Sequence, residues 1–489
     1  MKKTIINTLI LVFLATGFNS CFDENLAPVP ETSLSELSVF DTPERVQAQL
    51  LGMYAAFKSG QYLGGRYQVY NSIRSDHFLN IQTNGVTAYQ TWLHNLDPSS
   101  NEVNNLWAQI YAAVNRVNMF LEGMEANEEM LINDGIITRA VYDQYVGEAY
   151  ALRGMAYHHL VQLYAQPYNK DPNGLGAILR ITAQRSSADN DMARSTLQET
   201  YDQILSDLNL AETLLPDASG ANNADRITRL HKGSVAALKS RVYLQMNRWS
   251  DVITEANKLV SANAPFEAPS GVQYKLHDDF EEIFTTYTTS ESIFSIPMTS
   301  TETPGTQNFL AHYFTNAPMG GLEYPINQAG VVWQSSEFPA NDVRRLLVEE
   351  RTFQGIDHLF IHKYQDGSQL DWAPVIRYAE VLLNLAEALV KADGNVTPRA
   401  LALLNAVFQR ANPGAAALNI TNADAFIDRV HLEREMEFMA EGINNMDTQR
   451  TLGTHRAKEG APAVGPNSPQ YVWPIPQSEL NTNNLVQPN

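Results

Sequence analysis

The sequence predicts a mostly α-helical fold, in which tetratricopeptide-like helix pairs form a scaffold for an irregular, loop-rich region that contains a β-hairpin. Three observations lead to this prediction. Long segments near both ends of the chain carry apolar residues at helical spacing. Two predicted helices, at 228–246 and 249–260, are joined by only two residues. Between the helical parts, residues 264–345 alternate short apolar patches with proline and glycine.

The first twenty residues have the organisation of a secretory signal peptide. Lys2 and Lys3 form a basic start, residues 5–13 are an apolar stretch, and small polar residues lead to Cys21. The apolar stretch is shorter than the roughly 20 residues of a membrane-spanning helix. Because Cys21 is the only cysteine of the chain, it cannot form an internal disulfide. We predict a lipoprotein signal peptide at 1–20 and a lipid anchor on Cys21; an ordinary signal peptide before a chance cysteine is the alternative.

The remainder of the chain is acidic. Without residues 1–20 it has 469 residues, and the loss of Lys2 and Lys3 takes the formal net charge from −20 to −22. An acidic surface repels phosphate backbones, so nucleic acid is not an expected partner. Residues 21–40 are polar and contain prolines, and we predict that they form a lipid-anchored tether. No later segment has 18 consecutive apolar residues, and no membrane-spanning helix is expected there.

Helical signals dominate residues 41–263, which we predict to be an N-terminal helical region. A cap and a first-turn proline begin the first helix at Pro43. Ser99 and Glu102 have the spacing of a capping box at the start of the next long helix. Later helices are expected at about 142–165 and 195–215, the second of which starts with Ser195 and Gln198, and then at 228–246 and 249–260.

The last two of these helices are the clearest pair. Small residues lie where the helices must approach closely, and Leu244 and Trp249 fill the remaining space. This pattern is typical of a tetratricopeptide-type hairpin, although the strict signature is not met. Residues 264–489 are predicted to be a C-terminal region that combines the loop-rich insert with helices at about 372–392, 398–411 and 421–440.

Motifs of enzymes and cofactor sites are missing. The chain has no HExxH, GxSxG, P-loop or CxxC motif, and Gly174 and Gly176 form only a lone GxG. His158 and His159 are adjacent on a predicted helix and cannot face one ligand together. We therefore predict no catalytic residue, no cofactor and no metal ligand, while calcium bound by loop acids stays open.

Several carboxylates and arginines share one predicted helix near the C-terminus. Glu433, Glu435 and Glu437 lie close to Arg429 and Arg434 at helical spacing. A glycosidase would need two such acids across a sugar ring, one of them with a raised pKa. The favoured alternative is an ion-pair seam between packed helices, with Arg377 and Glu380 as partners.

The tryptophans can be sorted by their predicted surroundings. Trp107, Trp249, Trp372 and Trp473 lie on predicted helices or in an extended segment that packs on the body. Trp92 and Trp333 instead lie in stretches predicted to be non-helical, where an exposed indole ring would suit a sugar face. Tyr89, Trp92 and Asn95 place aromatic and amide groups within seven residues. The alternative is that each ring packs its own loop against the body.

Seven motifs in a shared order make the chain similar to the SusD/RagB family of surface glycan-binding lipoproteins. The resemblance extends from Cys21 to Asn489. The most specific motifs are RYAEVLLNLAEALV, HLEREMEFMAEG and VWPIPQSELNTNN, at residues 377–390, 431–442 and 472–484. The supporting motifs lie at residues 103–118, 147–168, 290–298 and 342–345. In one place the chain departs from the family, because Asn444 stands where an arginine is usual.

The resemblance implies about four tetratricopeptide-like helix pairs and no catalysis. It also implies a lipid-anchored protein of the outer membrane, facing the cell exterior, that binds a glycan and delivers it to a SusC-like TonB-dependent transporter. The acidic residues after Cys21 resemble surface-export signals. By position, the glycan-binding residues would be Trp92 and Asn95, with Tyr89 beside them, and a subset of Tyr287, Tyr313, Tyr324 and Trp333.

Two other functions are compatible with the sequence. One is a glycoside hydrolase, which sugar release from a polysaccharide would reveal. The other is a helical-repeat adaptor that binds only protein, which transporter capture without any glycan binding would reveal.

Overall fold

The computed structural model describes residues 39–188, 190–220, 222–315 and 321–489. The predicted signal peptide, Cys21 and nearly all of the predicted tether lie outside these residues. Helices predominate, and a single continuous hydrophobic core joins most of them. Within the described residues, no helix combines the length and the apolar character needed to cross a bilayer.

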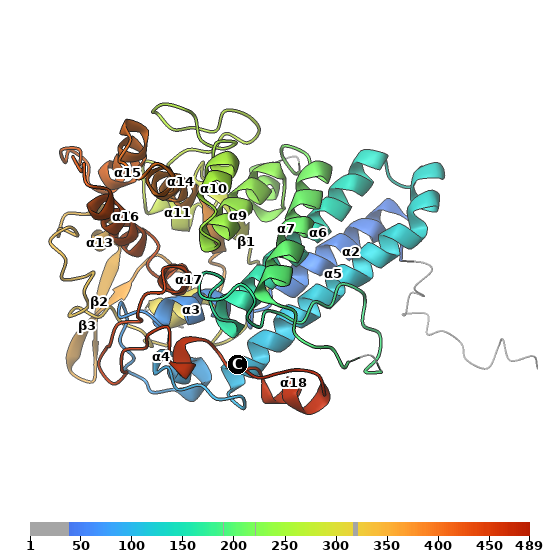
Figure 1. Ribbon diagram of the computed structural model, residues 1–489, viewed down its shortest axis with the longest axis horizontal. Helices are drawn as coiled ribbons and strands as arrows, with labels where there is room; N and C mark the ends of the chain where they lie inside the picture. The colour runs from blue at the N-terminus through green and yellow to red at the C-terminus, as the bar shows by residue number, and fades with distance from the viewer. Residues whose placement is uncertain (1–38, 189, 221, 316–320) are drawn as a thin grey trace, which may run out of the picture.

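Paired helices form the scaffold, as predicted. In the N-terminal half α2 packs on α5 and α6 packs on α7, and Figure 1 shows these four helices side by side. Further along the chain α9 packs on α10, α14 packs on α15, and α10 also packs on α14. The bounds of these helices are α2 Pro43–Phe57, α5 Asn101–Asn133, α6 Arg139–Tyr164, α7 Leu197–Leu214, α9 Lys232–Gln245, α10 Trp249–Ala256, α14 Tyr378–Asp393 and α15 Pro398–Ala411.

Several of the predicted helix starts are displaced, and α9 begins at Lys232 where the start was predicted at residue 228. Helix α7 begins with a capping box made by Thr196 and Glu199, one residue later than predicted. Helix α5 begins after Ser100, whose side chain makes no capping hydrogen bond, so the capping box predicted at Ser99 is wrong. The Ser99 hydroxyl instead donates to the carboxylate of Asp97, 2.6 Å away, in the preceding turn.

The helix predicted from Trp372 begins later than expected. Its first residues form the strand β4 (Ala373–Arg377), which pairs antiparallel with β1 (Ser292–Ile296), and α14 follows directly. Every residue of both strands is buried. Pro374, which would disturb a helix interior, is compatible with a short two-stranded pairing. The apolar run therefore divides between a strand and a helix.

The predicted β-hairpin is present, directly after the loop-rich stretch at residues 264–345. Strands β2 (Val348–Phe353) and β3 (Ile356–Ile361) pair antiparallel in continuous register. This hairpin lies near α4 and away from the four N-terminal helices (Figure 1). The short elements are α3 Arg66–Ile73, η3 Gly85–Thr87, α4 Tyr89–Trp92, α8 Asn223–Thr228, α11 Glu282–Thr285, α12 Leu310–Phe314, α13 Val343–Leu346, η4 Pro469–Tyr471 and α18 Gln477–Thr482.

Two further helices complete the C-terminal part, α16 (Ala423–Glu437) and α17 (Asn444–Arg450). The extended segment after them returns to the N-terminal half. Trp473 is buried there, with its ring against those of Tyr70 and Tyr164 at centroid distances of 5.0 and 5.6 Å. This confirms the prediction that Trp473 packs on the body.

Candidate functional site

A groove of about 610 Å³ lies between α4, the tip of the β2–β3 hairpin and a C-terminal loop. Three segments far apart in the sequence form its walls. Their lining residues are Leu79, Asn80, Ile81, Tyr89, Trp92, Phe353, Gln354, Ile356, His358, Glu459 and Gly460. The volume lies within the range of about 300–1,000 Å³ that is usual for ligand sites.

The first wall is the short helix α4. The rings of Tyr89 and Trp92 stack with centroids 6.0 Å apart and planes 15° apart. The Trp92 indole N–H donates to the carbonyl oxygen of Phe78 at 2.9 Å, which satisfies its one donor inside the protein. Trp92 is only 3% exposed, whereas Tyr89 is half-buried. Tyr89 therefore offers the accessible ring face, and Trp92 fixes its position.

The second wall is the tip of the hairpin. Gln354 and Gly355 form its turn with φ angles of 51° and 82°, both in the left-handed region that a type I′ turn requires. This turn pairs Phe353 with Ile356 directly across the ladder. Ile356 is 60% exposed. The hairpin thus presents an apolar pair to the groove, beside the polar side chains of Gln354 and His358.

The third wall is the loop around Gly460. The Lys458 ammonium is buried and donates to the backbone carbonyls of Ile73 and Ser75, while lying 5.2 Å from the centre of the Trp92 ring. Burial, and then Arg74, lower the pKa of Lys458 well below its ordinary value. Gly460 has φ 82°, and a Cβ there would lie 3.4 Å from the Trp92 ring. That distance is an ordinary contact, so glycine is favoured at this position by the left-handed backbone conformation.

An ion-pair cluster anchors two of these walls. Arg456, next to the Gly460 loop, pairs with Asp76 at 2.7 Å and also with Glu435 of α16. His77 Nε2 lies 2.9 Å from the Glu435 carboxylate. Burial would raise the pKa of Glu435, but His77 and Arg456 lower it to about 2. Asp76, His77 and Glu435 hold three potential metal-ligand atoms within 4.8 Å, and Arg456 already supplies the positive charge there.

Two of the seven predicted glycan-binding residues, Tyr89 and Trp92, line the groove. Asn95 is exposed one turn further on, where its amide group contacts Gln90 at 3.4 Å, and it is not among the lining residues. Tyr287 stacks on Trp372 with centroids 5.4 Å apart and donates to Asp371 at 2.9 Å, also outside the groove.

Of the two alternatives for Trp92 and Trp333, exposed indole rings are wrong, and packing of each ring against the body is confirmed. Trp333 is only 7% exposed, because Arg345 lies 4.3 Å above its ring and Phe338 contacts it. Tyr313 and Tyr324 are fully buried as well, and their hydroxyls donate to backbone carbonyls at 2.6 Å. Large rings in irregular segments stabilise those segments by burying apolar surface against the body. A contribution of the buried rings to glycan binding stays a prediction.

Sequence reasoning missed the hairpin tip and the Gly460 loop. The sequence signal for the hairpin tip was Gly355, which lies between two short runs that contain β-branched and aromatic residues. The sequence carried no signal for the Gly460 loop, because its contacts with Asp76, Ser75 and Trp92 join residues more than 350 positions apart in the chain.

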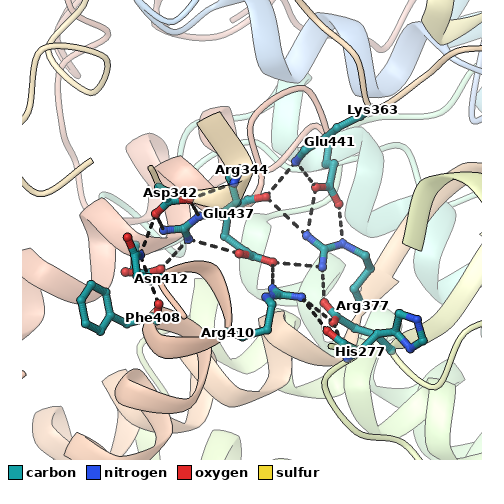
Figure 2. Close-up of polar contacts among 12 residues, drawn as sticks. His277, Asp342, Arg344, Lys363, Arg377, Phe408, Arg410, Asn412, Glu437 and Glu441 are labelled. Carbon is teal, nitrogen blue, oxygen red and sulfur yellow. Dashed lines mark hydrogen bonds and ion pairs between the residues drawn. The ribbon is translucent and has the colours of Figure 1, made fainter. Parts of the chain in front are cut away.

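The acidic helix α16 carries ion pairs, as predicted. Figure 2 shows Glu437 surrounded by the guanidinium groups of Arg344, Arg377 and Arg410, all of them buried. Burial would raise the pKa of Glu437, but these arginines lower it well below its ordinary value. Its carboxylate is therefore already engaged and ionised, unlike the general acid of a glycosidase. Of the two partners that the sequence suggested, Arg377 does pair here, whereas Glu380 pairs with Arg241.

Family models match two long parts of the chain. Residues 28–244 match a SusD-like model described as starch-binding and associating with the outer membrane, and residues 359–489 match the SusD family. A crystal structure of a SusD superfamily protein from Bacteroides fragilis is 32% identical, with a TM-score of 0.81 over 92% of this chain and 100% of that one. The chain belongs to the SusD family.

Other SusD relatives are more distant. A SusD-like protein of Formosa agariphila is 25% identical over 100% of this chain and 99% of its own length. A laminarin-binding SusD-like protein has a TM-score of 0.69 at 20% identity, covering 92% of this chain and 99% of that one. At 20% identity, this similarity shows a shared fold only.

The chain's departure from the SusD pattern at Asn444 lies at the start of α17. Asn444 is buried, and its side-chain oxygen has no hydrogen-bond partner in the described residues. The nearby Asp447 is paired all the same, with Arg434 and Arg450 at 2.7 Å each. Other arginines of the chain thus neutralise this acid without one at position 444.

Proposed function

We propose that this protein binds an oligosaccharide or polysaccharide at the cell surface, in the groove between α4 and the hairpin, and delivers it to a SusC-like TonB-dependent transporter without cleaving it. The observation that carries the proposal is the groove itself. The accessible ring of Tyr89 lies on one side, the apolar pair Phe353 and Ile356 on another, and polar side chains lie between them.

This arrangement suits a sugar because a pyranose ring has apolar faces and a rim of hydroxyl groups. Asn80, Gln354, His358 and Glu459 offer hydrogen-bond donors and acceptors for that rim. Micromolar affinity corresponds to about −8.2 kcal/mol, and one ring contact contributes on the order of 1 kcal/mol, so several sugar units would have to engage the groove. The names of SusD relatives, one of them laminarin-binding, support the ligand class.

The test compares variants that keep the fold. Tyr89→Ala and Ile356→Ala should each weaken binding of a neutral oligosaccharide about tenfold, or about 1.4 kcal/mol, in titration calorimetry. The melting temperature should hardly change, because both side chains are partly or largely exposed. Leu346→Ala is the matched control, since Leu346 is a similarly exposed apolar residue on α13, outside the groove.

Three results would contradict the proposal. Unchanged affinity in both groove variants would exclude the groove as the site. Sugar release from a polysaccharide, abolished by one carboxylate-to-amide change, would favour a hydrolase. Capture of the transporter together with a glycan panel that shows no binding would favour an adaptor.

A further inference from the structure

Trp249 has different surroundings from the other tryptophans. All six tryptophans lie in the described residues, and four of them are buried. Trp372 is partly exposed, but the ring of Tyr287 stacks on it. Trp249 is also partly exposed, and within the described residues no aromatic ring or cation packs on its indole. It forms one side of a cleft of about 500 Å³ that shares no lining residue with the groove.

Four helix ends meet around this cleft. The turn before α10 contributes Asn247, and the first residue of α10 is Trp249. The end of α14 contributes Lys391, and the start of α16 contributes Asp424 and Asp428. The segment after α17 completes the wall. Figure 1 shows α10, α14 and α16 as neighbours, separate from α4.

The floor of the cleft is a buried ion pair. Arg450 holds the Glu387 carboxylate with two hydrogen bonds of 2.6 and 2.7 Å, and His431 Nε2 lies 3.2 Å from the same carboxylate. Burial would raise the pKa of Glu387, but Arg450 and His431 lower it well below its ordinary value. Asn169 fixes the backbone carbonyl of Arg450 at 2.9 Å. The floor is therefore rigid and charged before any ligand arrives.

The rim, in contrast, carries side chains with free hydrogen-bonding capacity. Asn247, Lys391, Asp424 and Asp428 are all exposed, and no hydrogen bond or ion pair engages their side chains in the described residues. Together they offer both donors and acceptors around the indole face. One lysine against two aspartates leaves the rim slightly acidic, which disfavours an anionic ligand.

We propose that this cleft is a second sugar-binding site, which holds one end of a neutral oligosaccharide. A pyranose ring lies on the Trp249 indole, and its hydroxyl groups bond to Asn247, Asp424 and Asp428. The uncovered indole and the free polar rim are the same combination that suits a sugar in the groove, and the volume fits a ligand site. A peptide would need more apolar surface than this cleft offers, since only Leu452 and Ile427 add to the indole.

Acrylamide quenching of tryptophan fluorescence tests the proposal directly. Trp372→Phe leaves Trp249 as the only partly exposed tryptophan, so quenching of this variant reports mainly on the cleft. The probes are maltohexaose, cellohexaose and laminarihexaose. At least one of them should lower the quenching constant by about half, and Asp428→Asn in the same background should raise the required sugar concentration at least fivefold. Asp251→Asn, a charge on α10 outside the cleft, should leave it unchanged.

The same experiment includes a control for sugar binding in the groove. Adding Tyr89→Ala should leave the protection of Trp249 intact, because the two sites share no residue. Protection that disappears with Tyr89→Ala would assign the signal to the groove and overturn the second site, as would a quenching constant that none of the three sugars changes. Unchanged affinity of Tyr89→Ala and Ile356→Ala in calorimetry, with protection of Trp249 retained, would contradict only the proposed groove.

Discussion

At the scale of single residues, the buried charges of the C-terminal half form a closed network. Arg344 and Arg377 each lie 3.2 Å from the Glu437 carboxylate, and Arg410 also contacts it. Arg377 continues to Glu441 at 2.7 Å (Figure 2). Such a network is costly to leave incomplete, since each unpaired ion would remain desolvated.

Glu437→Gln should therefore be strongly destabilising. The amide keeps the shape of the side chain but leaves three arginines without their shared negative charge, and we expect a loss of about 3–5 kcal/mol in the free energy of unfolding. Urea denaturation measures it. Asp251→Asn removes the exposed pair with Arg248 and should cost less than about 1 kcal/mol. Equal losses of unfolding free energy in the two variants would contradict the assignment of Glu437 to a buried ion-pair network.

Buried histidines make stability depend on pH. Burial, and then Arg241, lower the pKa of His158 to about 3, and burial with Lys458 and Arg74 lowers that of His94 to about 2. Both stay neutral in the folded protein at pH 5 but bind a proton on unfolding, since the unfolded pKa is about 6.5. Their contribution to stability is thus fully present above pH 6.5 and is lost as the pH falls toward the folded pKa.

His158→Gln should reduce that dependence. One proton fewer is taken up on unfolding, so the slope of unfolding free energy against pH between 5.5 and 4.5 should fall by about 1.4 kcal/mol per pH unit. Urea denaturation at several pH values gives the slope, whatever the absolute stability of the variant. A slope identical to that of the unchanged protein would show that His158 is protonated in the folded state.

At the scale of elements, the groove depends on a hairpin attached to the body mainly at its base. One backbone hydrogen bond joins Ile326 to Leu359 of β3, and another, between His362 and Leu347, closes the hairpin at the end away from the tip. The tip itself is shaped by the left-handed turn at Gln354 and Gly355. Its apolar pair is therefore positioned by backbone conformation more than by packing.

Gly355→Val tests this dependence. A β-branched residue at φ 82° should destabilise the hairpin by about 1–2 kcal/mol and leave the rest of the protein unaffected. We expect faster amide hydrogen exchange in residues 348–361 and weaker oligosaccharide binding, with a nearly unchanged melting temperature. Gly52→Ala, in the middle of α2 with open space around the position, should instead stabilise the protein by about 0.5–1 kcal/mol. Unchanged amide hydrogen exchange in Gly355→Val would contradict the conclusion that the left-handed turn positions the hairpin tip.

Elements with strong local signals were predictable. Helix α15 begins at Pro398 and ends at Ala411, as predicted, because Thr397 and Pro398 encode its start locally. Strand β4 was not predictable, since its partner β1 lies about 80 residues earlier in the chain. Helix α4 was also missed, and its four residues are too few for a periodic pattern.

At the scale of the whole molecule, the helix pairs form one body, and α2, the first helix of the described residues, begins 22 residues after the predicted lipid anchor. Cys21→Ala should move the protein from the membrane fraction to the soluble fraction, because the acyl chains would be lost. The folded body should keep its melting temperature. Fractionation of cells and incorporation of labelled palmitate measure the effect, and a variant that remains in the membrane fraction would contradict the prediction of a lipid anchor.

The sequence by itself determined the helical class, the helix pairs, the family and the acidic character of the chain. These properties follow from local periodicity, composition and ordered motifs, which need no knowledge of distant contacts. Only the tertiary structure decided which aromatic rings remain available. Trp92, Trp333, Tyr313 and Tyr324 have loop-like sequence surroundings but are buried, because tertiary packing covers their rings. Tyr89 and Trp249 keep accessible faces where those segments leave a groove and a cleft.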